Sequence, residues 1–275
     1  MGGFKAGKTT SWLDIASWYQ RTETPGTFFV VDTDMTVERS SESYEDIHER
    51  LVVEESQDWP SAKLAIVKFK TEATEADWLI VDSIDFLWEA VQDWYVEQAF
   101  GETSDEFFLD YKRQGKEGHP LADGFGMNWN VIKKQYNPVL QTIRRFPGHV
   151  LVCTPAKSTA QDKDANVQRV FGKYGVKPEG EKRLGFHFHT VLLLLNNAKD
   201  DYRITTVGDR ARSELKNVQL SSFTMTYLKG TAGWTVPKSI IRLSMGPKRR
   251  GGPLGRNITK SWNRIKRYNN STKYW

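Results

Sequence analysis

The first residues whose types and spacing suit chemistry form a glycine-rich loop at the start of the chain. Residues 2–9, GGFKAGKT, match the pattern G-x-x-x-x-G-K-[ST]. Glycines let main-chain N–H groups turn inward around phosphate oxygens, and a following helix adds partial positive charge at its N-terminus. We expect Lys8 to reach the β- and γ-phosphates of a nucleotide and the Thr9 hydroxyl to ligate Mg²⁺. The alternative is a chance match in a glycine-rich tail. The predicted phosphate-binding residues are Gly2, Gly3, Phe4, Lys5, Ala6, Gly7, Lys8, Thr9 and Thr10.

Nucleotide hydrolysis also needs a carboxylate linked to Mg²⁺ and a group that orients the attacking water. Asp82 ends the apolar run WLIVD and is predicted to support Mg²⁺ through water. Asp34 follows the apolar run at residues 27–32, and we predict that it orients the water, because the carboxyl ends of strands form the ligand crevice of open α/β sheets. For each carboxylate, the alternative is an ordinary turn residue. Asp85 either joins the site or caps the next helix.

A further apolar run, residues 149–154, ends at Thr154. Its hydroxyl is predicted to face the γ-phosphate and sense its presence, the alternative being an ordinary strand-end threonine. Cys153 lies inside this run and is expected to be a small buried hydrophobic residue. Because it is the single cysteine, the sequence excludes an internal disulfide framework and a cysteine-built zinc site.

These residues must be positioned by strands and helices that alternate along the chain. The predicted strands are residues 27–32, 64–69, 78–82, 149–154 and 190–195, with 202–207 antiparallel to the last. The predicted helices are residues 9–20, 43–51, 86–99 and 129–146. Such alternation indicates an α/β fold with a mainly parallel twisted sheet and helices on both faces, and Lys68 suggests an edge position for residues 64–69. Residues 101–127 and 155–185 are longer than usual connections, so we expect functional loops or disorder there.

One expected element has no residues in the sequence. The glycine-rich loop should follow a strand at the centre of the sheet, but only Met1 precedes Gly2. We expect either that the natural product begins upstream, with Met1 an internal or mis-assigned start, or that another segment fills this place.

With these residues in place, the chain resembles the RecA-like P-loop ATPases, particularly the short phage-encoded RecA/RadA-like recombination ATPases. The resemblance runs from residue 2 to about residue 212. It is carried by GGFKAGKTT, VVDTD, WLIVDSID, the helix FGMNWNVIKKQYNPVLQTIRRF leading into HVLVCTPAK, and YRITTVGDRAR. It implies a RecA-like fold, ATP and Mg²⁺ as cofactors, and a homo-oligomeric ring or filament with ATP at the subunit interfaces.

The chain departs from that family at two positions. The carboxylate after the second strand is usually Glu but is Asp34 here, so hydrolysis is expected to be slow. The late hairpin of the family often ends in a Lys-x-Arg pair that reaches the neighbouring subunit's ATP, and here only Arg210 matches. Arg210 is therefore either a finger acting in trans or a surface arginine, with Arg212 or Lys157 as substitutes.

Two features point to a polyanionic partner. By resemblance the two long loops face DNA, the alternative being solvated loops; they carry Lys112, Arg113, Lys116, Lys157, Lys163, Arg169 and Lys173. Residues 246–275 contain nine Lys or Arg and no Asp or Glu, whereas the whole chain has a net charge of +5. Cations interleaved with aromatic residues suit single-stranded DNA, the alternative being a tail that packs on the body. The predicted DNA-binding residues of the tail are Lys248, Arg249, Arg250, Arg256, Lys260, Trp262, Arg264, Lys266 and Arg267.

The sequence therefore predicts a RecA-like P-loop ATPase core at residues 1–245, lacking its first strand, and a basic, aromatic-containing C-terminal extension at 246–275. We expect a cytoplasmic, ATP-hydrolysing protein of phage-type recombination or replication that acts on single-stranded DNA, without a membrane. The alternatives are a replicative-helicase-like motor and a non-hydrolysing, nucleotide-dependent DNA-binding or loader protein. His187 and His189 alternate in an expected strand and are read as structural rather than metal-binding.

Overall fold

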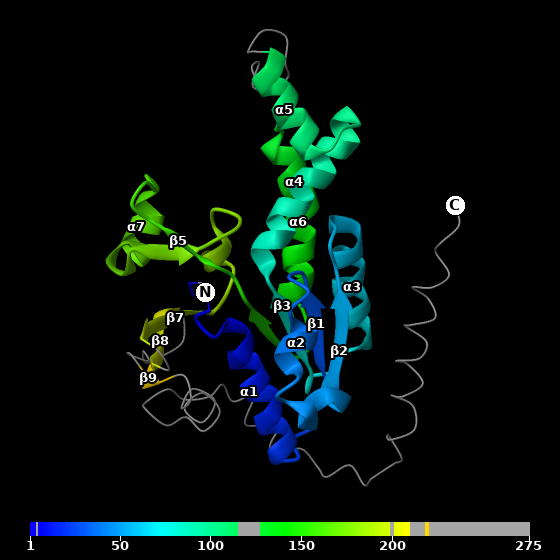
Figure 1. Ribbon diagram of the computed structural model, residues 1–275, viewed down its shortest axis with the longest axis vertical. Coiled ribbons are helices and arrows are strands. Elements are labelled where there is room, and N and C mark those ends of the chain that lie inside the picture. The colour runs from blue at the N-terminus through cyan, green and yellow to red at the C-terminus, as the bar shows by residue number, and fades with distance from the viewer. Residues whose placement is uncertain (4, 115–126, 199–200, 210–217, 220–275) are drawn as a thin grey trace, which may run out of the picture. The chain divides into compact units, whose positions relative to one another are not determined.

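The computed structural model describes residues 1–3, 5–114, 127–198, 201–209 and 218–219. At its centre lies a four-stranded, entirely parallel sheet in the order β2-β1-β3-β4 (Figure 1). The strands are β1 (Phe28–Asp32), β2 (Leu51–Glu55), β3 (Trp78–Asp82) and β4 (His149–Val152). Asp32 and Asp82 are direct neighbours in the register, so the carboxyl ends of β1 and β3 meet at one edge.

Alternate residues of β1 and β3 enter two separate hydrophobic clusters, one on each face of the sheet. Phe29, Val31, Leu79 and Val81 pack with α3 (Trp59–Glu72), α4 (Ile84–Phe100) and α6 (Trp129–Arg144). Phe28, Val30, Trp78 and Ile80 pack with α1 (Lys8–Arg21) on the opposite face. Because strand side chains alternate between faces, continuous apolar runs need helices on both sides. The predicted α/β layering is therefore confirmed.

The strand expected before the glycine-rich loop has no residues of its own, and Met1 and Gly2 occupy its place beside the end of β4. Gly2 forms parallel bridges with Pro155 on one side and Leu194 on the other. The Gly2 nitrogen donates to the Thr154 carbonyl oxygen at 3.2 Å, and the Leu194 nitrogen donates to the Met1 carbonyl oxygen at 2.9 Å. These two residues thus fill the place between β4 and β7 (Thr190–Ala198) with strand-like hydrogen bonds.

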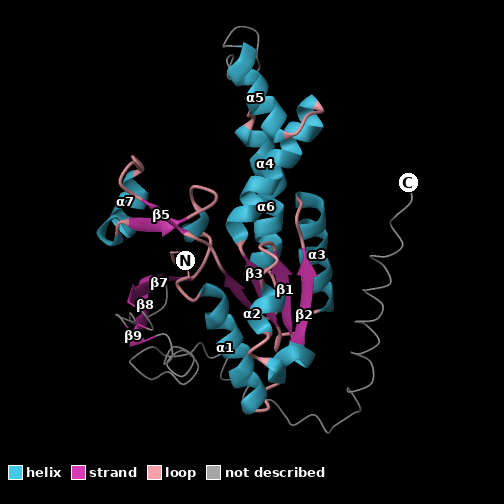
Figure 2. Cartoon of the chain, viewed as in Figure 1, coloured by secondary structure: helices cyan, strands magenta, loops and turns pink. Residues whose placement is uncertain are grey.

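Beyond that place the chain forms an antiparallel sheet. β7 pairs with β8 (Asp201–Asp209), as predicted, and β8 pairs with the short β9 (Val218–Gln219). A separate two-stranded sheet joins β5 (Ala156–Ser158) to β6 (Val176–Pro178), as Figure 2 shows. Between β5 and β6 lie α7 (Ala165–Phe171) and the 3-10 turn Gly172–Tyr174, and a further 3-10 turn at Leu184–Phe186 follows β6.

The edge strand predicted at residues 64–69 is wrong, because these residues belong to helix α3. Asp58 caps this helix by accepting the N–H of Ser61 at 2.7 Å, and a proline occupies its first turn. Both features start helices. Ala62, Ile66 and Phe69 are buried at helical spacing, whereas the apolar residue Leu64 faces solvent. Apolar residues occupy both faces of the helix here, which gave this short run the appearance of a buried strand.

The real edge strand is β2, which begins where the helix predicted at residues 43–51 should end. That segment is a 3-10 helix, Glu45–Arg50, preceded by the short helix α2 (Val37–Ser41). The first three residues of β2, Leu51, Val52 and Val53, are followed by Glu54 and Glu55. A five-residue edge strand with polar residues at one end leaves a weak signal in the sequence.

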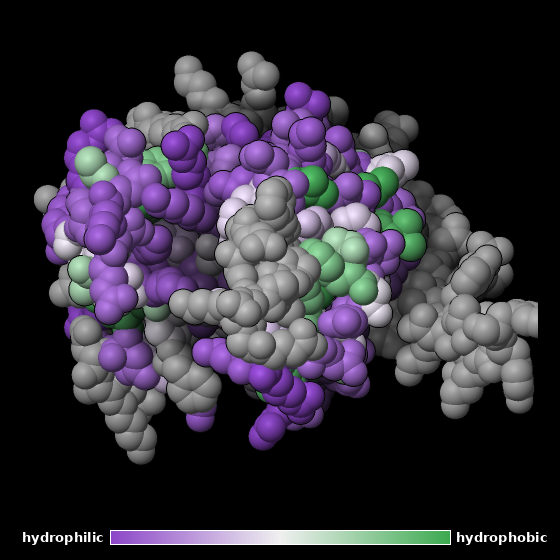
Figure 3. All heavy atoms as spheres, turned by 90° about the horizontal axis from the view of Figure 1, so that it is seen from above, coloured by the Kyte–Doolittle hydropathy of each residue, from purple (hydrophilic) through white to green (hydrophobic). Residues whose placement is uncertain are grey.

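The two long segments expected to be loops contain regular structure. Residues 104–114 form helix α5 (Ser104–Gln114), and residues 155–185 contain the β5–β6 pair and α7. In Figure 1, α4, α5 and α6 rise above the central sheet. Four apolar residues of α5 and α6 are exposed: Phe108, Leu109, Trp129 and Val131. The face seen in Figure 3 is mainly hydrophilic, with small hydrophobic patches. Within the described ranges, none of the helices has the length and apolar character needed to cross a membrane.

Candidate active site

The glycine-rich loop leads directly into helix α1. Gly7, just before the helix, has a left-handed backbone with φ of 84°, which glycine adopts without steric cost. Its carbonyl oxygen accepts the N–H of Ser11 at 2.9 Å. The Lys8 ammonium lies 3.2 Å from the carbonyl oxygen of Gly3 and 3.5 Å from that of Gly2. The loop, the α1 N-terminus and this ammonium therefore place positive charge at one point, where a phosphate can bind.

Thr9, Trp12 and Asp82 meet at a single carboxylate oxygen. The Thr9 hydroxyl donates to Oδ2 of Asp82 at 2.9 Å, and the Trp12 indole N–H donates to the same oxygen at 3.1 Å. Asp82 is 2% exposed and ends β3. A hydroxyl and a carboxylate are hard oxygen ligands of the kind that Mg²⁺ prefers. The donor set thus fits Mg²⁺ held beside nucleotide phosphates, and the structure brings the two predicted metal-binding residues into direct contact.

Asp34 lies beyond the end of β1, on the same edge as Asp82. The Ser83 hydroxyl donates to Oδ1 of Asp34 at 3.4 Å. Partial burial of the carboxylate raises the pKa of Asp34, and the negative charge of Asp82 raises it further. The residue as a whole is exposed, so water can reach it. Asp34 therefore lies at the same edge of the sheet as Asp82, and its role in orienting water stays a prediction.

Thr154 lies next to the glycine-rich loop, two residues after β4 ends at Val152. Its carbonyl oxygen accepts the N–H of Gly2, and its hydroxyl donates to the carbonyl oxygen of Glu179 at 2.8 Å. The hydroxyl therefore ties the end of β4 to the end of β6, and its role as a γ-phosphate sensor stays a prediction. Cys153 is 3% exposed, as expected for a small buried hydrophobic residue.

Three further carboxylates gather near the site, and two of them escaped the sequence analysis. Burial raises the pKa of Asp85, and the charges of Asp34 and Glu179 add to the effect. Burial also raises the pKa of Glu89, helped by Asp85 and Glu179. Glu89 is one helical turn after Asp85 on α4, a signal that could have been noticed. Glu179 follows β6, in a segment read as a loop, so nothing in its local sequence pointed to the site.

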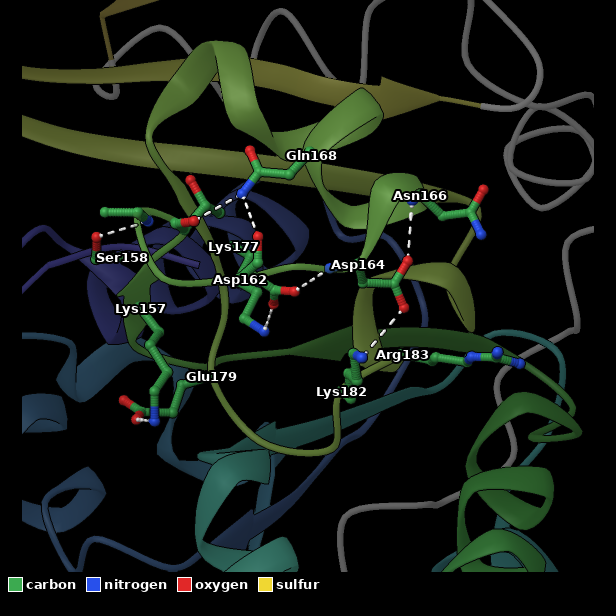
Figure 4. Close-up of polar contacts among 12 residues, drawn as sticks. Lys157, Ser158, Asp162, Asp164, Asn166, Gln168, Lys177, Glu179, Lys182 and Arg183 are labelled. Atoms are coloured by element: carbon green, nitrogen blue, oxygen red, sulfur yellow. Dashed lines mark hydrogen bonds and ion pairs between the residues drawn. The ribbon is translucent and has the colours of Figure 1, made fainter.

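The segment from β5 to β6 carries a set of ion pairs, seen in Figure 4. Lys157 pairs with Glu179 at 3.1 Å, Lys182 pairs with Asp164 at 3.3 Å, and Lys177 pairs with Asp162. Asp164 also caps α7 by accepting the N–H of Asn166, at 2.9 Å. Of the basic residues predicted to face DNA in this segment, Lys157 is engaged in one of these ion pairs, and the DNA contacts of Lys157, Lys163, Arg169 and Lys173 stay predictions.

Several predicted residues lie outside the described part of the chain. They are Phe4, Lys116, Arg210, Arg212 and all the basic and aromatic residues chosen from the tail at 246–275. Lys112 and Arg113 lie at the end of α5. His187 and His189 are not in a strand, which corrects that expectation. Among the residues that the structure describes, no group of three or more His, Cys, Asp or Glu could hold a metal ion by itself.

A family model described as an AAA domain matches residues 1–192, which include the glycine-rich loop, Asp34, Asp82 and Thr154. No curated protein matches the chain.

Proposed function

The chain belongs to the AAA domain family, a family of P-loop ATPases, and we propose that it hydrolyses ATP under stimulation by single-stranded DNA in phage-type recombination or replication. The observation that carries the proposal is the contact of the Thr9 hydroxyl with the Asp82 carboxylate at 2.9 Å, beside the Lys8 loop. A parallel-sheet edge that joins these groups is suited to a nucleotide with Mg²⁺.

Each residue of the site has a distinct task in this proposal. The loop N–H groups and Lys8 bind the phosphate oxygens, and Thr9 and Asp82 hold Mg²⁺. When bound, Mg²⁺ supplies positive charge that neutralises the phosphates during transfer. Asp34 accepts a hydrogen bond from the attacking water and orients it. Arg210 of one copy of the chain is proposed to contact the phosphates of the ATP bound to the neighbouring copy.

The DNA and assembly parts of the proposal draw on charge and on the resemblance to RecA-like ATPases. Residues 246–275 carry nine positive side chains and no negative ones, which favours a polyanionic partner. Trp262 and neighbouring aromatic residues suit stacking on unpaired bases. A ring or filament in the cytoplasm, with ATP between subunits, completes the RecA-like interpretation.

A second candidate function is a non-hydrolysing switch, in which ATP only controls assembly on DNA. Asp34 favours it, because an aspartate has a shorter arm than the glutamate expected at this position. Its long contact with Ser83, 3.4 Å, is also compatible with a weakly active site.

The test is steady-state ATP hydrolysis by the purified chain, with and without single-stranded DNA. Lys8→Ala is expected to lower turnover at least about 100-fold, because it removes a charge that stabilises the transition state. Lys63→Ala, at an exposed position of α3, is the matched control and should behave as the original chain.

The outcomes separate the candidates. DNA-stimulated turnover that Lys8→Ala abolishes supports the ATPase. ATP-dependent DNA binding without turnover supports the switch. If the original chain neither binds nucleotide nor hydrolyses it, both candidates are contradicted.

A further inference from the structure

The last residue of β1 and the two residues after it are held in three different ways. Asp32, 1% exposed, accepts the N–H of Val37 at 2.9 Å and so fixes the start of α2. Thr33, 6% exposed, is bonded to Ser83. Asp34 is exposed; the Ser83 hydroxyl donates to its carboxylate, and hydrogen bonds from the side chains of Ser83 and Thr33 both lower its pKa. Asp34 therefore directly follows two anchored residues, Asp32 and Thr33.

The Thr33 hydroxyl makes two bonds to the backbone of one residue. It accepts the N–H of Ser83 at 2.6 Å and donates to the carbonyl oxygen of Ser83 at 3.0 Å. Ser83 is 2% exposed, so neither of these backbone groups is well placed to exchange the hydroxyl for water. Buried backbone groups without a partner are costly, which makes this hydroxyl hard to replace.

The sheet itself does not supply this connection. The register of β1 and β3 ends at Asp32 and Asp82, and the last backbone bond runs from the Thr33 nitrogen to the Asp82 carbonyl oxygen at 2.9 Å. Beyond this bond, the ends of the two strands are joined by the Thr33 side chain, whose hydroxyl is bonded to the Ser83 backbone. Ser83 in turn uses its own hydroxyl to hold Asp34.

We propose that Thr33 is a positioning residue for ATP hydrolysis: by fixing the Ser83 backbone, it aims the Ser83 hydroxyl at Asp34 and so sets the carboxylate that orients water. This inference rests on the proposed function. It adds a residue that is not among those proposed to bind nucleotide or Mg²⁺, and it gives a reason for a threonine between two acidic residues.

Thr33→Val tests the inference, because valine keeps the shape and removes the hydroxyl. A misplacement of about 1 Å at a reacting group can cost about 100-fold in rate. We therefore expect kcat to fall about 10- to 100-fold, while KM and nucleotide affinity change less than about 3-fold, since Lys8, Thr9 and Asp82 keep their contacts. Thr33→Ser keeps the hydroxyl and should restore most of kcat.

The pH profile separates positioning from a merely structural role. A carboxylate that loses a hydrogen-bond donor has a higher pKa. The charged groups facing Asp34 are Lys8 on α1, Asp82 on β3 and Asp85 on α4, and all are retained in Thr33→Val. The acidic limb of the kcat profile should therefore move to higher pH in Thr33→Val and return in Thr33→Ser. If Thr33→Val does not fold, Ser83→Ala removes the donor to Asp34 directly and should raise the pKa of Asp34 in the same direction; because Ser83 also hydrogen-bonds to Asp85, the pKa of Asp85 should rise in this variant too.

Failure of this inference can be told apart from failure of the proposed function. An original chain with turnover, beside a Thr33→Val variant with unchanged kcat and pH profile, overturns the role of Thr33 and leaves the ATPase intact. If the original chain has no turnover, the ATPase fails, and the side-chain titration of Asp34, followed by carboxyl carbon NMR, decides the rest. A higher pKa in Thr33→Val then supports the positioning of Asp34, and an unchanged pKa overturns it.

Discussion

Carboxylates in two regions of this chain are held by opposite kinds of partner. At the strand-end site, formed by residues 32–34, 82–83 and α1, the Asp82 carboxylate accepts from a hydroxyl and an indole N–H. In the β5–β6 segment, residues 156–178 with the turn after them, Asp162, Asp164 and Glu179 each pair with a lysine. The first region keeps its negative charge available, and the second neutralises it internally.

The pKa directions follow this difference. Burial raises the pKa of Asp32 and Asp34. By contrast, the hydrogen bond from Lys177 lowers the pKa of Asp162, and the hydrogen bond from the Asn166 N–H lowers that of Asp164. The carboxylates of the strand-end site are thus held by neutral donors, whereas those of the β5–β6 segment pair with lysines. The predictions below test this contrast.

The largest expected effect is on Asp82. Asp82→Asn keeps an oxygen that accepts from Trp12 but removes the charge, so turnover should fall about 100- to 1,000-fold with little loss of stability. Asp82→Ala should lose as much turnover and, because the Trp12 N–H then lacks its acceptor, about 1–3 kcal/mol of unfolding free energy. Steady-state kinetics and denaturant unfolding measure the two effects.

Asp164→Asn in the β5–β6 segment is the matched control. It makes the same chemical change at a carboxylate that pairs with Lys182 at 3.3 Å. Turnover without DNA should stay within about 2-fold of the original. Equal losses of turnover at both positions would show that the two regions do not differ in the way described.

The strand-end site was predictable where the sequence is local and continuous. The glycine-rich loop and the apolar runs before Asp34 and Asp82 specify phosphate binding and parallel strands within a few residues each. Since parallel strands end at a common edge, the meeting of these carboxylates could be inferred without coordinates. The hydrogen bonds between the Thr33 hydroxyl and the Ser83 backbone could not be inferred, because they join a side chain to a backbone fifty residues further along the chain.

The β5–β6 segment was missed for a different reason. Its strands have three residues each, and its helix has seven, so neither builds a clear period. Its fold depends on ion pairs between residues such as Lys157 and Glu179, whose partners no local pattern reveals. Similarly, α3 was taken for a strand because the six residues at 64–69 are too few to separate a helical period from a strand.

Asp34→Asn should lower turnover less than Asp82→Asn does. It should also raise stability at neutral pH, whereas Asp82→Ala lowers it. Turnover should fall about 100-fold through loss of the carboxylate that is proposed to orient water. The folded pKa of Asp34 is raised above the ordinary value of 3.8, so its ionisation at neutral pH opposes folding. Stability from this group is greatest below 3.8 and falls as pH rises through the folded pKa. Thermal unfolding at pH 7 should therefore show a higher Tm for Asp34→Asn, and the gain should vanish below pH 3.8.

The exposed carboxylate Glu38 on α2 gives the control for that experiment, as Glu38→Gln. It should change neither turnover nor the pH dependence of Tm. A Tm that falls in Asp34→Asn at neutral pH would mean that the charge of Asp34 is compensated in the fold, which would remove the contrast with the β5–β6 segment at this residue.

The smallest expected effect is on the ion pair of Lys157 and Glu179, which joins β5 to the end of β6. Lys157 is 61% exposed, and exposed ion pairs contribute less than about 1 kcal/mol. Lys157→Met keeps the apolar stem, so a double-mutant cycle with Glu179→Gln should give a coupling below that value, shrinking further in 1 M salt. A larger, salt-resistant coupling would place Glu179 among the buried charges of the strand-end site.

The same variant tests the electrostatic environment of Glu89. Since the positive charge of Lys157 lowers the pKa of Glu89, Lys157→Met should raise that pKa, which carboxyl NMR can follow.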